Sequence, residues 1–147
     1  MSGPTPGFLV WRLATRWRVA VDRALAPLGL THAQYAALAS LSALQAGGRR
    51  PSQRQLADHT GLEPLYVSKL CRALAAAGLL ERTPDPADSR AVQLALTAAG
   101  EAAVAKAVPE VRRLVGRLLA PLGPERTDAF VRDLHVLLEA PLTAEEP

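Results

Sequence analysis

The sequence predicts a mainly α-helical protein built around a winged helix–turn–helix, with terminal helices that form a dimerisation region. Three observations predict this fold. Two helical segments, joined by a short turn at Gly61, lie between Ser52 and Gly78. A Pro- and Asp-rich tip, 85–90, follows between two short stretches of β pattern. Amphipathic segments flank this unit on both sides.

The composition agrees with one folded domain over residues 1–147, which is long enough to bury a core. A hydrophobic content of 49% excludes disorder, and 4% aromatic residues with abundant Ala and Leu favour helix. No apolar run approaches the roughly 18 residues of a membrane span, and Met1–Gly7 lacks the pattern of a signal peptide. A single Cys excludes an intrachain disulfide, so we expect a cytoplasmic protein without membrane contact.

The first helix is predicted from Phe8 to about Ala26, because apolar residues recur there at helical spacing, and Pro27 and Gly29 end it. A Thr-x-x-Gln capping box at residues 31–34 opens a second helix to about residue 45. A Ser-x-x-Gln box at residues 52–55 then opens a short helix that stops at residue 61.

The next helix begins with Pro64, whose missing N–H costs little at the first position, and Gly78 is its left-handed cap after Ala77. Alternating apolar residues at 92, 94 and 96 predict a half-buried strand of a hairpin. Thr97 then caps a long helix that Pro109 should kink, because it removes a backbone donor.

Pro121 and the pair Gly123-Pro124 break the chain again, and a last amphipathic helix follows. Its apolar residues are Phe130, Leu134, Leu137 and Leu138. We expect Thr143–Pro147 to be a frayed tail.

The segments 8–28 and 97–140 are too apolar on one face to stand alone beside the DNA-binding lobe, 31–96. They pack either on their own core or against a second subunit. A two-fold dimer is the commonest solution for such surfaces, and helix–turn–helix dimers match two half-sites about 34–36 Å apart.

Charge is distributed unevenly along the chain. Residues 1–30 carry a net charge of +3, residues 31–96 carry +2 and residues 97–147 carry −2. A basic front and an acidic tail suit a protein that meets phosphate on one side, although ordinary surface scatter explains so small a polarity equally well.

The helix that begins at Pro64 has two different faces, and Pro64 itself lies on the polar face, which could accept DNA, together with Ser68 and Arg72. Ser68 and Lys69 supply donors on the polar face, and Arg72 supplies a bidentate fork that suits guanine. Leu65 suits a thymine methyl, and the Tyr66 hydroxyl suits a phosphate. The opposite face is apolar and consists of Val67, Leu70, Cys71 and Leu74. The alternative is an ordinary solvated face on a packed helix.

A second contact is predicted at the start of the preceding helix. Ser52, Gln53 and Arg54 lie at its N-terminus, where backbone N–H groups attract phosphate and Arg54 adds positive charge.

Three segments match, in this order, the patterns G-L-hydrophobic-x-R, D-x-x-D-x-R and L-x-L-T-x-x-G. They are Gly78-Leu79-Leu80-Glu81-Arg82, Asp85-Pro86-Ala87-Asp88-Ser89-Arg90 and Leu94-Ala95-Leu96-Thr97-Ala98-Ala99-Gly100. In this order and spacing they resemble the signature of the multiple-antibiotic-resistance regulator (MarR) family. The resemblance implies that Arg90 enters the minor groove of DNA from the wing, that Asp88 orients it through a salt bridge, and that the terminal helices dimerise.

The resemblance also implies a small aromatic or lipophilic effector, bound between the dimerisation region and the DNA-binding lobe. The residues available there are Trp11, Arg16, Trp17, His32, Tyr35 and Arg113. Trp and Tyr beside Arg suit an anionic aromatic ligand. The alternative is that Trp17 and Tyr35 are core residues and that the arginines are solvated.

Other site chemistry finds little support. Cys71 falls on an apolar face, and the family's peroxide sensors carry their cysteine near the N-terminus, so we expect an inert thiol. His32, His59 and His135 are scattered without metal-ligand spacing, so no metal or other cofactor is expected. No phosphate loop or catalytic motif is present, which argues against an enzyme.

Together these observations predict a homodimeric regulator that binds a palindromic site in double-stranded DNA, most simply as a repressor released by an effector. The alternative is a winged-helix module that works through protein partners. Such a module should have lost its basic surface residues, whereas Lys69, Arg72 and Arg90 are all present.

Overall fold

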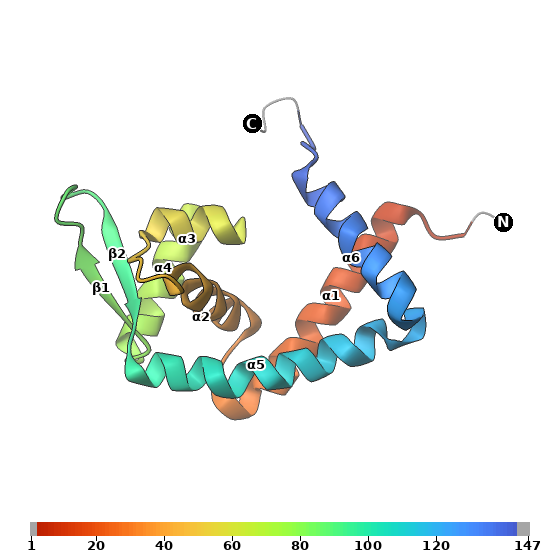
Figure 1. Cartoon of the computed structure of the whole chain (residues 1–147), viewed down its shortest axis with the longest axis horizontal. Coiled ribbons are helices and arrows are strands. Elements are labelled where there is room, and N and C mark those ends of the chain that lie inside the picture. The colour runs from red at the N-terminus through yellow and green to blue at the C-terminus, as the bar shows by residue number, and fades with distance from the viewer. Residues whose placement is uncertain (1–2, 144–147) are drawn as a thin grey trace. The chain divides into compact units, whose positions relative to one another are not determined.

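The computed structural model describes residues 3–143, so most of the predicted tail, from residue 144 onward, lies outside the described residues. The elements, in order, are α1 (Pro6–Leu25), a 3₁₀ turn (Ala26–Leu28), α2 (His32–Gln45), α3 (Gln53–Thr60), α4 (Pro64–Ala76), β1 (Leu80–Pro84), β2 (Val92–Leu96), α5 (Ala98–Leu119), a second 3₁₀ turn (Ala120–Leu122) and α6 (Gly123–Glu139) (Figure 1). This mainly helical order with one hairpin confirms the predicted fold class. The chain divides into two compact units after Val111.

Local capping sets the helix starts, as predicted. At α2 the Thr31 Oγ1 accepts a hydrogen bond from the Gln34 N–H at 3.2 Å, and the Gln34 side chain accepts the Thr31 N–H at 3.0 Å. The capping box at the start of α3 is equally complete. Helix α1 begins earlier than predicted, because Thr5 caps it and Pro6 opens it.

The core of the first unit lies between α2, α3, α4 and the hairpin. Its fully buried side chains include Leu38, Leu41, Leu56, Val67, Leu74 and Leu94, joined by Val21 and Leu25 of α1. Every one of these residues is apolar, and no polar or charged residue is buried in the part of the chain that the structure describes. The polar chemistry of this unit is therefore left to its surface.

The hairpin pairs β1 with β2 in antiparallel register, from Leu80 opposite Leu96 to Pro84 opposite Val92. Leu94 is the only fully buried residue of β2, and the other residues of the strand are half-buried, so the predicted alternation is weaker than expected. The strand gains a further partner because the Leu94 N–H donates to the Pro51 carbonyl at 2.9 Å. This bond fixes the wing to the start of α3.

The base of the hairpin crosses the start of α5 closely. The Thr97 Oγ1 donates to the Gly78 carbonyl at 2.6 Å and accepts from the Gly100 N–H at 3.0 Å. The Thr97 N–H donates to the Leu79 carbonyl at 3.2 Å. Gly100 is buried, and a Cβ built on it would lie 1.9 Å from the Leu79 carbonyl oxygen, so only glycine fits this crossing.

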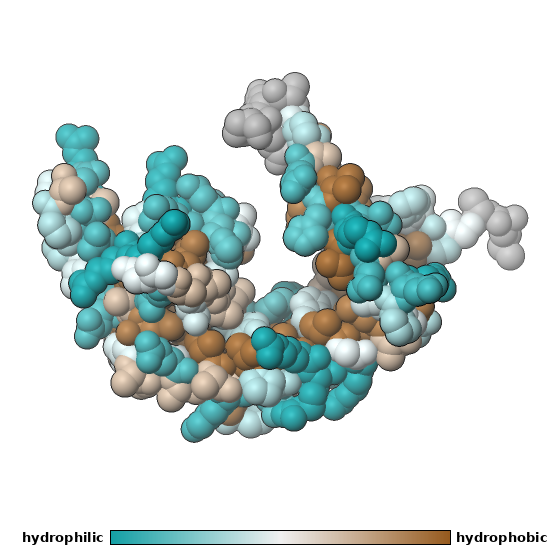
Figure 2. All heavy atoms as spheres, viewed as in Figure 1, coloured by the Kyte–Doolittle hydropathy of each residue, from teal (hydrophilic) through white to brown (hydrophobic). Residues whose placement is uncertain are grey.

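Helix α5 continues through Pro109 to Leu119. In the second unit, α6 has no buried residue. Phe130 is half-buried, whereas Val131, Leu134, Val136, Leu137 and Leu138 are exposed, Leu138 by 83%. Hydrophobic surface is visible along α6 in Figure 2. The N-terminal turns of α1 expose a comparable group, namely Phe8, Leu9, Val10, Trp11 and Leu13.

Residues 3–143 contain neither a membrane-spanning helix nor a metal-binding cluster. None of the helices there combines the length and apolarity that a bilayer crossing requires. No group of three His, Cys, Asp or Glu side chains is arranged to hold a metal ion in that part of the chain.

Candidate nucleic-acid interface

Helix α4 begins with a carboxylate over its free backbone donors. The Glu63 side chain accepts the N–H groups of Leu65 and Tyr66, each at 3.3 Å. A negative charge therefore already occupies the end of the helix that would otherwise attract an anion. Phosphate binding does not suit this helix end, and α4 offers its side chains instead. Sequence reasoning missed this role of Glu63, although a Glu directly before a helix-opening Pro signals it.

The two faces of α4 differ as predicted. Val67, Leu70, Cys71 and Leu74 are buried against the core. On the opposite face Leu65 is 75% exposed and Tyr66 is 44% exposed. Lys69 and Arg72 are exposed, and Ser68 is half-buried. Five predicted DNA-contacting residues thus share one accessible face of one rigid helix.

Arg72 is held on that face by Ser68. Its Nη2 donates to the Ser68 Oγ at 3.0 Å, and its Nε donates to the Ser68 carbonyl oxygen at 3.4 Å. The two residues lie four positions apart, one helical turn, which places them side by side. The guanidinium therefore has a defined orientation along the helix.

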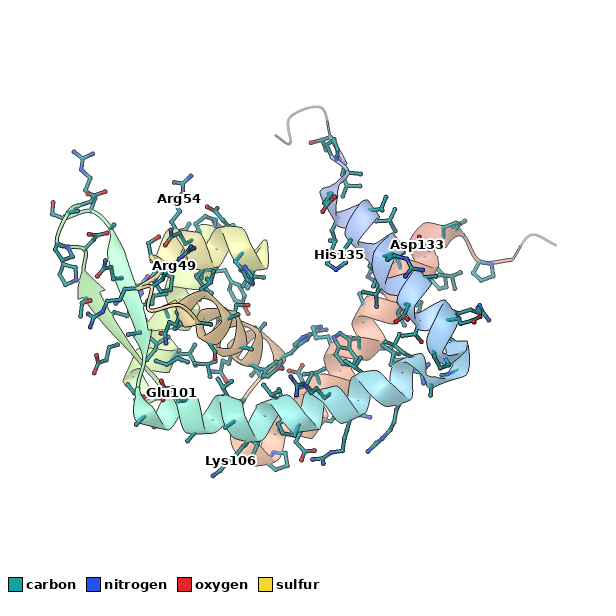
Figure 3. All side chains as sticks on the ribbon, viewed as in Figure 1. Arg49, Arg54, Glu101, Lys106, Asp133 and His135 are labelled. Atoms are coloured by element: carbon teal, nitrogen blue, oxygen red, sulfur yellow. The ribbon has the colours of Figure 1, made fainter. Side chains whose placement is uncertain are left out.

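The predicted phosphate site and the predicted wing residue line one surface hollow. Its volume is about 180 Å³, and its lining residues are Ser52, Gln53, Arg54, Pro64, Arg90, Ala91 and Val92. Two arginines, Arg54 and Arg90, thus line one hollow beside the N-terminus of α3, whose dipole also favours an anion. Figure 3 shows Arg54 projecting from α3 toward the side of this unit on which the hairpin tip lies, and that side is mostly hydrophilic in Figure 2.

The wing tip is a tight turn held by two aspartates. The Asp85 carboxylate accepts the Ala87 N–H at 2.8 Å, and the Asp88 carboxylate accepts the Arg90 N–H at 3.0 Å. The salt bridge from Asp88 to a wing arginine, which the family resemblance implies, stays a prediction, because the hydrogen bond that the Asp88 carboxylate accepts comes from the Arg90 backbone N–H. The Asp88 carboxylate fixes the backbone of Arg90. The short side chain of an aspartate lies close to the backbone N–H two residues further along the chain, which is the usual geometry of such a turn.

The predicted effector residues are not gathered in one place. Trp17 and His32 make an edge-on ring contact, with centroids 6.3 Å apart, whereas Trp11 packs beside Phe8. Arg16 lines a separate hollow on α1. Tyr35 is half-buried on α2, and Arg113 belongs to the second compact unit.

His32 lines a larger surface hollow of about 410 Å³. The other residues around it are Arg18, Asp22, Ala26, Leu30, Thr31, Ala33 and Tyr66. Asp22 accepts the His32 N–H at 2.7 Å. Partial burial lowers the pKa of the His32 ring, Asp22 acts in the opposite direction and Arg18 adds to the lowering. Sequence reasoning missed Arg18, Asp22 and Tyr66 here, because only the fold brings α1, α2 and α4 together.

Cys71 is expected to be unreactive in the folded protein. It is fully buried, and desolvation raises its pKa to about 11, with Arg82 acting in the opposite direction. The thiolate is the reactive form and is scarce at neutral pH. We therefore expect N-ethylmaleimide to label the native protein at least about 100-fold more slowly than the protein unfolded in guanidinium chloride. Rapid labelling of the native protein would contradict the assignment of Cys71 as a packed thiol.

Comparison with known proteins adds to this geometry. Residues 28–91, which span α2 to the wing, match the family model described as MarR family. The chain is 37% identical over 140 residues to the uncharacterized HTH-type transcriptional regulator YdcH of Bacillus subtilis, covering 94% of each chain.

The chain belongs to the MarR family of transcriptional regulators.

Two further MarR-type proteins are similar over most of their length. The HTH-type transcriptional repressor Rv2887 of Mycobacterium tuberculosis is 34% identical over 131 residues, covering 89% of this chain and 91% of the repressor. A crystal structure of Rv2887 with salicylic acid superposes with a TM-score of 0.69 at 31% identity, over 92% of this chain and 98% of that one. The structure of the transcriptional repressor CouR bound to a 23-mer DNA duplex superposes with a TM-score of 0.82 at 29% identity, and the match covers 92% of this chain and 93% of CouR.

Proposed function

We propose that this MarR-family protein is a repressor that binds a palindromic operator as a homodimer and is released by a small effector. The observation that carries the proposal is the convergence of the α3 N-terminus, the start of α4 and the wing Arg90 around one basic hollow. The repressor CouR, which has the same fold, is bound to a DNA duplex in its structure, which supports this use of the surface. Relatives of this kind are regulators and not enzymes, so no catalytic role is proposed.

In this proposal, different segments of the DNA-binding lobe, 31–96, contact the bases, the phosphates and the minor groove. Helix α4 enters the major groove, where its exposed face meets base edges. Ser52, Gln53 and Arg54 bind phosphate at the start of α3, which fixes the register of the protein on the duplex. Arg90 enters the adjacent minor groove, where negative potential is concentrated.

The segments 8–28 and 97–140 are proposed to form the dimer within a single domain. The exposed apolar side chains at the start of α1 and along α6 are too many for isolated surface residues. A second copy of the chain covers them most simply, because a two-fold interface uses the same surface on both subunits. The α4 helices of the two subunits then face two successive major grooves on the same side of the duplex.

The proposed effector is an anionic aromatic compound. Rv2887 has been crystallised with salicylic acid, an aromatic carboxylate. In this chain the hollow around His32 offers the Arg18 guanidinium for charge, and Trp17 lies at ring contact distance from His32. A ligand bound there releases DNA only if it binds the DNA-free conformation more tightly than the DNA-bound one.

The test is binding of the purified protein to duplex DNA from immediately upstream of its own gene, across a salt series. We expect one tight site, occupied by a dimer in sedimentation velocity, whose affinity falls about tenfold or more between 50 and 200 mM salt because phosphate contacts release counterions. A scrambled duplex of equal length is the control. A folded dimer that selects no duplex, even from a random library, would favour the alternative that this module works through protein partners.

A further inference from the structure

We infer that Ser68 is a positioning residue for Arg72, and that it turns the end of the guanidinium, Nη1 and Nη2, toward the DNA. The inference rests on the proposed DNA-binding function and adds a specificity device to it. Arg72 would recognise a guanine, and Ser68 would determine how strictly it does so.

The geometry selects one edge of the guanidinium. The two donors that bind Ser68 are Nε, at 3.4 Å from the carbonyl oxygen, and Nη2, at 3.0 Å from Oγ. These donors lie on the same lateral edge of the planar group. With that edge occupied, the pair of parallel N–H groups that remains is on the terminal edge, one on Nη1 and one on Nη2. A single pose of the arginine is therefore presented to the groove.

That pose matches one base. Guanine displays O6 and N7 in the major groove, two acceptors that take parallel N–H groups from one arginine. Arginine in solution loses considerable side-chain freedom when it binds in a single orientation. Two hydrogen bonds to its own helix order the Arg72 side chain in advance, which favours the bidentate contact over looser contacts with other bases.

Helix α4 itself carries no carboxylate that could compete for Arg72. The Glu63 carboxylate, directly before the helix, accepts the N–H groups of Leu65 and Tyr66. Arg72 and Lys69 are exposed, whereas Ser68 is half-buried. This arrangement suits Ser68 as a support beneath the guanidinium better than as a direct contact to a base edge.

The two roles of Ser68 predict different mutant behaviour. If Ser68 acts through Arg72, its replacement has no further effect on base preference once Arg72 is gone. If Ser68 contacts a base itself, its replacement changes base preference in either background. A double-mutant cycle separates these cases.

The experiment is selection from a random duplex library with the full-length wild type and with Ser68→Ala, Ser68→Thr, Arg72→Ala and the double variant. Arg72→Ala identifies the base pair that Arg72 recognises. At that pair we expect Ser68→Ala to lower the preference for guanine about fivefold or more, the lower end of what one bidentate contact provides. Ser68→Thr, which keeps the hydroxyl, should retain the preference, and the double variant should match Arg72→Ala. Ser42→Ala, a half-buried Ser on α2, is the matched control.

A second readout does not depend on DNA. In the free protein, the Nη2 protons of Arg72, one of which is donated to the Ser68 Oγ, should exchange with water severalfold faster in Ser68→Ala than in the wild type or Ser68→Thr. Equal exchange rates, or an unchanged guanine preference in Ser68→Ala, would overturn the inference while leaving the DNA-binding function intact. If the wild type selects no sequence at all, the proposed function fails, and the inference fails with it.

Discussion

Arg90→Ala is expected to weaken operator binding at least about tenfold, which corresponds to about 1.4 kcal/mol, without lowering the melting temperature. The side chain is exposed at the wing and borders the hollow shared with Ser52, Gln53 and Arg54. The turn that carries it depends on its backbone, because Asp88 accepts the Arg90 N–H. Alanine keeps that N–H, so the fold is retained while the cation directed at the DNA is lost.

The matched control is Arg126→Ala, which removes the same charge from an exposed position on α6. Fluorescence anisotropy with a labelled operator measures affinity, and thermal unfolding measures stability. Affinity equal to that of the wild type in Arg90→Ala would refute the wing assignment. An equal loss in both variants would show that the affinity follows the net charge of the protein and not a contact made by Arg90.

Gly100→Ala is expected to destabilise the protein by about 2 kcal/mol, within the range for overpacking at a rigid contact. The added Cβ would lie 1.9 Å from the Leu79 carbonyl oxygen, which belongs to the backbone and cannot rotate away. For a domain of this size the melting temperature should fall by about 4–8 °C. The sign is informative, because Gly to Ala inside a helix ordinarily stabilises by about 0.5–1 kcal/mol.

Helix α5 supplies its own control for this substitution. Gly116 lies in the same helix, and a Cβ built on it meets nothing within 4 Å. Gly116→Ala should therefore leave the melting temperature unchanged or raise it by a few degrees. If differential scanning calorimetry gave Gly100→Ala the same stability as Gly116→Ala, the close crossing of α5 and the base of the hairpin would be disproved.

The features that the sequence predicted well are set by residues three or four positions apart. The capping boxes at Thr31 and Ser52 are complete, and Gly61 and Gly78 adopt the left-handed conformation, with φ of +70° and +75°. Such signals act within one turn of chain and survive any tertiary arrangement. The two faces of α4 were predictable for the same reason, since burial follows the helical period.

Features that depend on distant segments were not predictable. The Gln45 side chain accepts the Leu96 N–H at 2.8 Å across 51 residues, and no local pattern indicates that pairing. The residues around the His32 hollow come from three helices, so residue type alone did not find Arg18 or Asp22. The hydrogen bond from the Arg90 N–H to the Asp88 carboxylate was not predicted either, because the family resemblance suggested a role for Asp88 toward a side chain and not toward the backbone of the turn.

The crossing at Thr97 and Gly100 has a mechanical consequence. Two hydrogen bonds from Thr97, which precedes α5, and a contact of Gly100 too close for a methyl group join the start of α5 to the base of the wing at Gly78 and Leu79. A joint packed this closely transmits a displacement and does not absorb it. A displacement of the first turn of α5 therefore reaches the base of the hairpin directly, and the bond from the Leu94 N–H to the Pro51 carbonyl passes it on to the start of α3. A structural change at the start of α5 can therefore alter the position of the wing without any contact at the wing tip.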